Sequence, residues 1–270
     1  MLSAKCTLAL TGAGLSTESG LPDYRSEGVG LYARTNRRPM DYQSFVSDEK
    51  NRRKYWARNF VGWSYFSRVL PNFGHRQISH WWDQNKVSFI ITQNVDRLHH
   101  QAGPGHILEL HGTSHFVVCL GCGHRISRAN LQEQLIDLNP DWNSLLETNV
   151  DVAPDGDVEL PDDLVHKFQV PPCSKCTSGI LKPDVVFFGE NLPADRKIQA
   201  SSWVDRADLL LCLGSSLQTF SSYRLVLQAH KAGKPIVIVN IGPTRADPLA
   251  SLILNAKISD TLRMVHPLIS

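Results

Sequence analysis

The chain has 270 residues, of which 42% are hydrophobic and 20% charged, a composition of ordinary globular proteins that excludes disorder, collagen and coiled coils. Its formal net charge is only +2 and its Lys and Arg residues are scattered, which excludes the basic patch expected of a nucleic-acid partner. No stretch approaches the roughly 20 apolar residues that span a bilayer, so we expect no membrane partner.

Short apolar runs alternate with helix-like stretches along most of the chain. The runs predict buried strands at residues 6–10, 87–92, 185–188, 209–213 and 236–240. Helices are predicted at residues 47–70, 76–84, 194–206 and 223–231. Strand alternating with helix predicts an α/β protein with a doubly wound, Rossmann-like parallel sheet, and the length suits such a domain with a small insertion.

One block, residues 119–182, breaks this alternation and begins and ends with a pair of cysteines. We predict a main domain in residues 1–118 and 183–270, with a helical loop insertion at about 33–72, and a small zinc-binding module in residues 119–182. Residues 139–169 of the module hold three prolines, Gly156 and several aspartates, and are predicted to form a long surface excursion.

The start of the chain lacks the basic region and long apolar core of a targeting signal. Because a strand is predicted almost at once, we expect that any targeting peptide is absent from this chain. The six cysteines form two close pairs plus Cys6 and Cys212, which lie in apolar runs. This pattern predicts a metal site and two buried thiols rather than disulfides, and a reducing compartment.

A glycine-rich turn, Gly12-Ala13-Gly14-Leu15-Ser16, follows the first predicted strand and is expected to open a helix. Such a turn lets backbone amides and the helix N-terminus meet a pyrophosphate, although an ordinary tight turn is the alternative. A dehydrogenase would carry glycine at position 17 and then an acidic residue on a second strand, whereas the chain has Thr17 and a polar loop. We expect that loop to cover a dinucleotide. Its Arg and Tyr residues are Tyr24, Arg25, Tyr32, Arg34, Arg37 and Arg38, with Tyr42 just beyond.

Polar residues follow three other predicted strands, where the carboxyl ends of parallel strands form one crevice. They are Gln93-Asn94-Val95-Asp96, Gly214-Ser215-Ser216 and Asn240-Ile241-Gly242. An amide there can recognise the carboxamide of nicotinamide, and a carboxylate can hold a ribose hydroxyl or favour positive charge on the sugar. The alternative for Asn94 and Asp96 is a helix cap.

His111 ends the short apolar run 108–110 and is followed by Gly112. A strand end that faces a crevice suits a general base, because imidazole titrates near neutrality and can take a proton from a sugar hydroxyl. The chain has 11 histidines, so the alternative is a surface or core residue, and the local competitors are His99, His100 and His115.

Two Cys-x-x-Cys pairs, Cys119 with Cys122 and Cys173 with Cys176, predict one tetrahedral zinc site. Four thiolates leave no open position, so this zinc is expected to be structural. Residues 182–190 form an apolar run that ends in Gly189 and Glu190. An extended peptide can pair along such an edge, and a plain core strand is the alternative.

Taken in order, the motifs of the chain resemble those of the sirtuin family. They are Gly12-Ala-Gly14-x-Ser16, Asp23-Tyr-Arg25, Thr92-Gln-Asn94-x-Asp96, His111-Gly112, the two cysteine pairs, Phe188-Gly189-Glu190 and Gly214-Ser-Ser216. The set covers nearly the whole chain. Residues 20–34, 55–63 and 240–245 are similar to the mitochondrial class II branch of that family, which implies the mitochondrial matrix.

The resemblance implies an NAD-dependent protein lysine deacylase, which consumes NAD and forms nicotinamide and O-acyl-ADP-ribose. By this analogy His111 is the base, and acyl-lysine proteins are the substrates. The implied NAD-binding residues are Gly12, Ala13, Gly14, Ser16, Asp23, Tyr24, Arg25, Tyr32, Gln93, Asn94, Val95, Asp96, Gly214, Ser215, Ser216, Asn240, Ile241, Gly242 and Ile258. The implied substrate residues are Val186, Phe187, Gly189 and Glu190.

One departure bears on the acyl group. Sirtuins that remove succinyl groups carry a Tyr and an Arg three residues apart, where this chain has Ala57 and Phe60. The departure argues against succinyl removal, and Arg58 leaves another acidic acyl group open. We expect acyl groups longer or bulkier than acetyl, such as lipoyl, biotinyl or methylglutaryl, and hypothesise that residues 139–169 reach back to line the acyl channel.

Three other functions stay open. The same NAD cleavage can pass ADP-ribose to a protein, which would make the chain a protein ADP-ribosyltransferase. A binding module that senses NAD with weak catalysis is a second alternative. A dehydrogenase is the third, and it would reduce NAD rather than cleave it.

Overall fold

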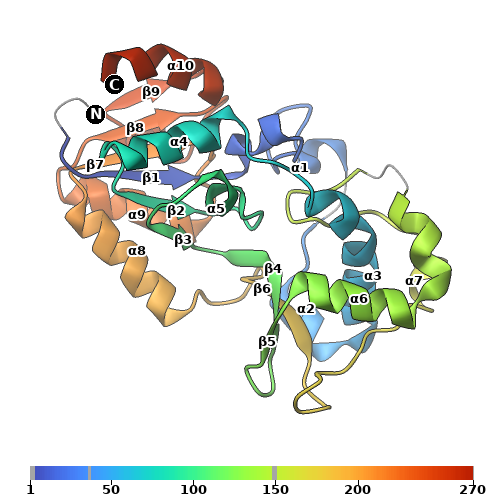
Figure 1. Ribbon diagram of the computed structural model, residues 1–270. Helices are drawn as coiled ribbons and strands as arrows, with labels where there is room; N and C mark the ends of the chain where they lie inside the picture. The colour runs from blue at the N-terminus through green and yellow to red at the C-terminus, as the bar shows by residue number, and fades with distance from the viewer. Residues whose placement is uncertain (1–3, 36–37, 148–150, 270) are drawn as a thin grey trace.

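Figure 1 shows a computed structural model of the chain, in which a parallel sheet covered by helices lies beside a smaller unit. The structure describes residues 4–35, 38–147 and 151–269. Within these residues, none of the helices is both long and apolar enough to cross a membrane. Arg37 of the polar loop and part of the 139–169 segment lie outside the described residues.

The main sheet has six parallel strands in the order β3-β2-β1-β7-β8-β9. They are β1 (Thr7–Thr11), β2 (Phe89–Thr92), β3 (Ile107–Glu109), β7 (Leu209–Leu213), β8 (Ile236–Val239) and β9 (Leu252–Leu254). Strands β1 and β7 are buried along their whole length, since helices cover both faces of the sheet. The prediction of a doubly wound parallel sheet is confirmed.

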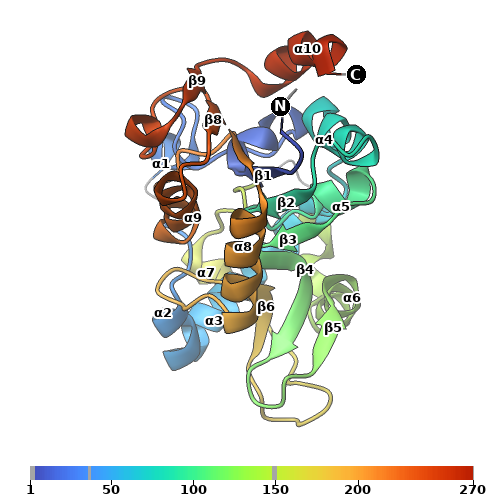
Figure 2. The same cartoon turned by 90° about the vertical axis from the view of Figure 1, so that its left-hand side faces the viewer.

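Helices α8 (Ala194–Arg206) and α9 (Phe220–Lys231) cover one face of this sheet (Figure 2). Helices α4 (Phe73–Asp83) and α10 (Ile258–Ile269) pack on the other face. The short helix α5 (Leu98–Ala102) lies beside α4. The bounds of α8 equal the predicted ones, whereas α4 begins three residues earlier than predicted. A capping box explains the shift: the Asn72 side chain accepts from His75 N, and Asn72 N donates to His75 Nδ1.

The smaller unit is built on an antiparallel sheet with the order β5-β4-β6. Its strands are β4 (Gly112–Cys119), β5 (Arg125–Ser127) and β6 (Leu181–Val185). Around it lie α2 (Tyr42–Ser47), α3 (Glu49–Phe66), α6 (Arg128–Leu138), α7 (Asp162–Val165) and the 3-10 helix η3 (Pro140–Glu147), whereas α1 (Leu31–Arg34) lies apart from this sheet, in the polar loop. Phe60 of α3, Trp142 and Phe168 share one aromatic core. The division of the chain into two domains remains our proposal.

The strand predicted at residues 185–188 is wrong, because the strand is Leu181–Val185 and belongs to the antiparallel sheet. The apolar run after it is buried for a different reason. Phe187 packs against Phe45 and Tyr55, with ring centroids 5.2 and 5.3 Å away. Phe188 forms only an isolated bridge with Asp41.

The prediction of a surface excursion at residues 139–169 is right for exposed residues such as Asp162 and Lys167 but wrong for the apolar ones. Val152, Ala153, Val158 and Phe168 are at most 4% exposed. The segment crosses α3 so closely that a Cβ atom on Gly62 would lie 2.0 Å from the carbonyl oxygen of Gly156. Buried apolar side chains therefore hold this segment against α3.

Candidate active site

The candidate site lies where the glycine-rich turn meets the end of β7. Gly12 N donates to Leu213 O at 3.1 Å, and Gly14 N donates to Gly214 O at 2.9 Å. A Cβ atom on Gly12 would lie 2.7 Å from Ser215 Cβ, and one on Gly14 would lie 2.9 Å from Gly214 O. Both positions require glycine because two strand ends approach this closely.

The helix expected after this turn is absent in the described structure. Two 3-10 helices replace it, η1 (Ala13–Leu15) and η2 (Thr17–Ser19). Gly20, with φ of +95°, ends the second one, and Pro22 follows. An anion here would therefore meet backbone amides rather than the dipole of a long helix.

Ser16, Asn94 and Asp96 come from two strand ends and meet in a buried cluster. Ser16 Oγ donates to Asp96 Oδ2 at 2.6 Å and accepts from Asn94 Nδ2 at 3.0 Å. Asn94 Nδ2 also donates to Gly12 O at 3.1 Å. Asp96 Oδ1 accepts from the amide of Leu98, the first residue of α5, at 3.0 Å, although the N-cap residue of that helix is Arg97. Burial raises the pKa of Asp96 above its usual value.

Gln93 ties the same crevice to the start of α9. Its Nε2 atom donates to Ser215 Oγ at 2.9 Å, and its Oε1 atom accepts from Thr219 Oγ1 at 3.1 Å. Val95 is 7% exposed, and its carbonyl oxygen accepts from Ser114 N at 2.9 Å. Val95 therefore faces the core, whereas Gln93, Asn94 and Asp96 make polar contacts at the strand ends.

His111 lies at the edge of this crevice with both ring nitrogens engaged. Nδ1 is 3.2 Å from the carbonyl oxygen of Gln93, and Nε2 is 2.7 Å from Ser221 Oγ. Burial lowers the pKa of His111 to about 4, against a smaller raising effect of the hydrogen bond to Gln93. The imidazole is therefore neutral at pH 7 and able to accept a proton.

The competing histidines serve other contacts. His99 is 3% exposed and its Nε2 lies 3.0 Å from Thr11 Oγ1. His115 Nε2 lies 3.1 Å from the carbonyl oxygen of Asp96, and His100 Nδ1 lies 3.6 Å from Glu109 Oε1. Burial raises the pKa of Glu109 to about 7. Neither His99 nor His115 presents a ring nitrogen to Ser221.

Burial also holds several histidines neutral, which makes stability depend on pH. Four buried histidines have pKa values below the value of about 6.5 in the unfolded chain. They are His75, His99, His111 and His115. Between pH 6.5 and about 4 the unfolded chain binds more protons, so the free energy of unfolding falls as pH falls. We expect a loss of about 1–2 kcal/mol per histidine between pH 7 and 5, partly offset by Glu109, whose raised pKa acts in the opposite direction. Urea denaturation at both pH values measures this, and equal stability at pH 5 and 7 would contradict it.

The polar loop after the turn is ordered by its own side chains. Asp23 Oδ1 accepts from Arg25 N and Ser26 N at 2.9 and 2.7 Å. The Arg25 guanidinium lies 5.4 Å from the centre of the Tyr32 ring, which is 5.6 Å from that of Tyr24. Arg34 forms an ion pair of 3.1 Å with Asp151, which connects the loop to the segment over α3.

Four of the implied NAD-binding residues lie in the segment after β8 and at the start of α10. Asn240 Nδ2 donates to Ile241 O at 2.9 Å and to Gly242 O at 3.0 Å. Ile241 is 60% exposed. Ile258 is buried beside Gly214, where a Cβ atom would lie 2.8 Å from Ile258 Cδ1. Ser216 contributes its carbonyl oxygen to Arg245 N at 3.0 Å, so it contacts the segment after β8 as well.

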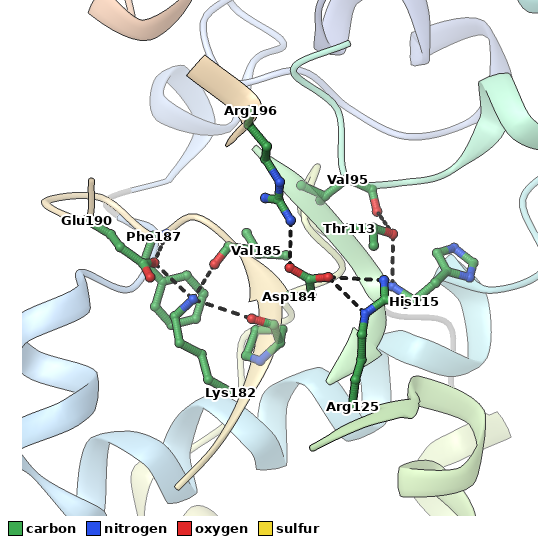
Figure 3. Close-up of polar contacts among 11 residues, drawn as sticks. Val95, Thr113, His115, Arg125, Lys182, Asp184, Val185, Phe187, Glu190 and Arg196 are labelled. Atoms are coloured by element: carbon green, nitrogen blue, oxygen red, sulfur yellow. Dashed lines mark hydrogen bonds and ion pairs between the residues drawn. The ribbon is translucent and has the colours of Figure 1, made fainter. Parts of the chain in front are cut away.

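The predicted substrate residues follow β6 and are braced by a polar cluster (Figure 3). Val186 N donates to His111 O at 2.8 Å. Glu190 Oε2 accepts from Phe187 N at 2.8 Å and lies 2.9 Å from Lys182 Nζ, so it turns inwards. Phe187 is buried, whereas Gly189 is exposed. Strand β6 is an edge of its sheet, but the predicted residues follow it, and the amides of Val186 and Phe187 already donate within the protein.

The four paired cysteines meet at one end of the antiparallel sheet. All four sulfur atoms lie within 4.8 Å of one another. Cys119 Sγ is 3.6 Å from Cys176 Sγ, and Cys122 Sγ is 3.8 Å from Cys173 Sγ. A tetrahedron with zinc–sulfur bonds of about 2.3 Å has edges of about 3.8 Å. The donor set therefore fits Zn²⁺. Cys6 and Cys212 lie outside this cluster.

Comparison with known proteins agrees with this geometry. The model of the Sir2 family matches residues 12–221 of the chain. The chain belongs to the Sir2 family. It is 50% identical to NAD-dependent protein lipoamidase sirtuin-4, mitochondrial, of Bos taurus, over 98% of this chain and 82% of that relative. It is 47% identical to NAD-dependent protein deacylase Sirt4 of Drosophila melanogaster, over 97% of this chain and 83% of that relative.

Solved structures give the same result. Sir2Tm bound to a propionylated peptide superposes on this Sir2-family chain with a TM-score of 0.73, at 30% identity over 99% of this chain and 95% of that one. Sir2 bound to an acetylated peptide superposes with a TM-score of 0.73, at 28% identity over 99% and 95%. The sirtuin resemblance found in the sequence is confirmed.

Sequence reasoning missed several polar residues of this Sir2-family site. Ser221 and Thr219 contact His111 and Gln93, and three hydroxyl residues around the start of a helix were the available signal. Asp184 pairs with Arg196 at 2.8 Å and with Arg125 at 3.1 Å. These ion pairs join residues far apart in the chain, so no local pattern indicates them.

Proposed function

We propose that this chain is an NAD-dependent protein lysine deacylase that forms nicotinamide, free lysine and O-acyl-ADP-ribose. Family membership and the printed names of the relatives support the reaction class. The observation that carries the proposal is the neutral imidazole of His111, which contacts Ser221 at Nε2 and the Gln93 carbonyl at Nδ1, while the Gln93 side chain donates to Ser215. The relatives from Bos taurus and Homo sapiens are named mitochondrial, which supports the mitochondrial matrix as the location.

The glycine-rich turn packs directly against the Gly214 loop, and a turn of this kind can offer backbone groups to the diphosphate of NAD. We assign the diphosphate and its ribose to Gly12, Ala13, Gly14, Ser16, Arg25, Gly214, Ser215 and Ser216. We assign the nicotinamide side to Gln93, Asn94, Val95 and Asp96, and the adenosine to Asn240, Ile241, Gly242 and Ile258. Asp23, Tyr24 and Tyr32 would order the covering loop. NAD would supply the ribose carbon that carries a good leaving group.

Within this proposal, His111 takes a proton from a ribose hydroxyl at Nε2. The resulting imidazolium keeps its Nδ1–H on the carbonyl oxygen of Gln93, which stabilises the positive charge. Asp96 holds Ser16 and through it Asn94, so the three polar groups keep fixed directions. Val186, Phe187, Gly189 and Glu190 would present the backbone that the substrate peptide pairs with.

We further propose that Cys119, Cys122, Cys173 and Cys176 bind one structural Zn²⁺. Their thiolates would complete a tetrahedral shell, so no position is left for water or substrate. The zinc would hold the β4–β5 turn to the segment before β6, which are 51 residues apart between Cys122 and Cys173.

The acyl group proposed for this site is longer or bulkier than acetyl. Ala57 and Phe60 are fully buried in α3, and neither can bind a carboxylate. Arg58 already forms an ion pair of 2.6 Å with Asp157 and donates to Val158 O at 2.5 Å. An acidic acyl group would therefore compete with Asp157 for Arg58. The lipoamidase names of two relatives favour a neutral, lipoyl-like group.

The pair between Arg58 and Asp157 provides a test of acyl preference. Asp157→Asn removes the competing carboxylate, so we expect kcat/KM for a methylglutaryl peptide to rise about 3- to 10-fold relative to a lipoyl peptide, the effect of roughly one partly buried ion pair. A point substitution is preferable to deletion of residues 150–168, which begin outside the described residues. The deletion would also remove the buried side chains of Val158 and Phe168 and would therefore test the fold instead of acyl selection. Asp162→Asn is the matched control, because Asp162 pairs with Lys54 of the same helix at 2.5 Å but is exposed. An unchanged ratio in Asp157→Asn would contradict a role of this segment in acyl selection.

A panel of acylated peptides assayed with NAD tests the reaction itself. We expect free lysine and O-acyl-ADP-ribose in equal amounts by mass spectrometry. A mass gain of ADP-ribose on the protein substrate would indicate the transferase instead, and NAD binding without any product would indicate a sensing module. Absorbance from reduced NAD would indicate a dehydrogenase.

A further inference from the structure

The tautomer of His111 follows from its two hydrogen bonds. The carbonyl oxygen of Gln93 can only accept, so Nδ1, at 3.2 Å, carries the hydrogen. In the neutral ring Nε2 is then the acceptor, and the Ser221 hydroxyl at 2.7 Å donates to it. The lone pair of the proposed base is thus already occupied by a side chain of the protein.

The position of Ser221 is fixed by helix α9, whose N-cap residue contacts the Gln93 side chain. It lies in the first turn of α9, after Thr219 at the N-cap. Thr219 Oγ1 donates to Gln93 Oε1 at 3.1 Å, and Thr219 O accepts from Tyr223 N at 3.0 Å. A closed circuit of hydrogen bonds and helix backbone therefore joins Gln93, His111, Ser221 and Thr219. This circuit fixes the imidazole at both nitrogens.

We propose that Ser221 is a positioning residue, whose hydroxyl caps Nε2 of His111 in the resting enzyme and yields this atom to a sugar hydroxyl of the bound substrate. The inference rests on the proposed function, in which His111 is the base. An imidazole nitrogen offers a single lone pair, so the Ser221 hydroxyl and a substrate hydroxyl compete for one position. The hydrogen bond from Ser221 fixes the direction of Nε2 before the substrate binds.

Nitrogen NMR of the full chain labelled in histidine tests the cap without any ligand. We expect His111 of the native protein in the Nδ1–H tautomer. Ser221→Ala should keep this tautomer, because the Gln93 carbonyl remains, but should move the Nε2 signal downfield, towards that of an imidazole nitrogen that accepts no hydrogen bond. Ser221→Thr, which keeps the hydroxyl, should restore the native signal. An Nε2 signal unchanged in Ser221→Ala would overturn the proposal.

Calorimetry with ADP-ribose and ADP tests the competition. A hydrogen bond contributes about 0.5–1.5 kcal/mol, so ADP-ribose is expected to bind about 2- to 12-fold more tightly to Ser221→Ala than to the native protein. ADP lacks the second ribose and should bind both equally. If the two affinities change together or neither changes, Ser221 supports only the fold of α9. A wrong role for His111 would show separately, as unchanged deacylation in His111→Ala, while the change in the Nε2 signal of Ser221→Ala stands.

Discussion

His111→Ala is expected to lower kcat for peptide deacylation by about 10²- to 10⁴-fold, the usual contribution of a positioned general base. The loss follows from the geometry of the ring. Nδ1 is bonded to the carbonyl oxygen of Gln93 and Nε2 faces Ser221 beside the glycine turn. Alanine removes the proton acceptor and both hydrogen bonds. The measurement is steady-state formation of deacylated peptide at pH 7.5, where the native imidazole is neutral because its pKa is about 4.

A matched control is available on the helix that carries Ser221. His230 lies in the last turn of α9 and is exposed, far along the helix from Ser221 in its first turn. His230→Ala should therefore keep the native rate. Deacylation by His111→Ala within twofold of the native rate, with the fold intact by circular dichroism, would remove His111 from the reaction.

Cys173→Ser is expected to abolish zinc binding and to unfold the antiparallel sheet. Structural zinc in finger peptides binds with about 10–16 kcal/mol, and this free energy is coupled to folding. Cys173 is fully buried beside Cys122, so serine would replace a thiolate by a weaker ligand without access to solvent. Zinc content per chain, thermal unfolding and the circular dichroism spectrum report the effect together.

Cys6→Ser is the control for this variant. Cys6 is a half-buried thiol outside the four-sulfur cluster, so its replacement should leave one zinc per chain. A Cys173→Ser protein that still holds one equivalent of zinc at native stability would show that the four thiolates do not form the site.

The main sheet was predictable because its strands are buried on both faces. Strand β7 and helix α8 agree with the sequence prediction to the residue, since uniform burial gives β7 an uninterrupted apolar run. The run at 185–188 has the same pattern, but only Val185 lies in a strand, Phe187 packs on the rings of Phe45 and Tyr55, and Phe188 is 45% exposed. A short apolar run therefore does not by itself specify a strand.

The candidate site could be predicted from the sequence only where its residues belong to a local motif. The turn at Gly12 and the cysteine pairs have fixed spacings, so the sequence alone indicates them. The contact between Ser221 and His111 joins residues 110 positions apart, and the ion pair between Arg58 and Asp157 depends on where the crossing segment lies. Such contacts are set by tertiary packing and leave no periodic signal.

The aromatic core shared by α3 and residues 140–168 has a consequence for how the chain acquires its structure during synthesis. Phe60 packs against Trp142 and Phe168, so α3 cannot bury its apolar side until about a hundred further residues have been made. Contacts this distant along the chain are slow to form. Metal uptake has to wait still longer, for Cys176. We therefore expect α3 to stay exposed while about a hundred further residues are made, which makes this helix the natural site for chaperone binding.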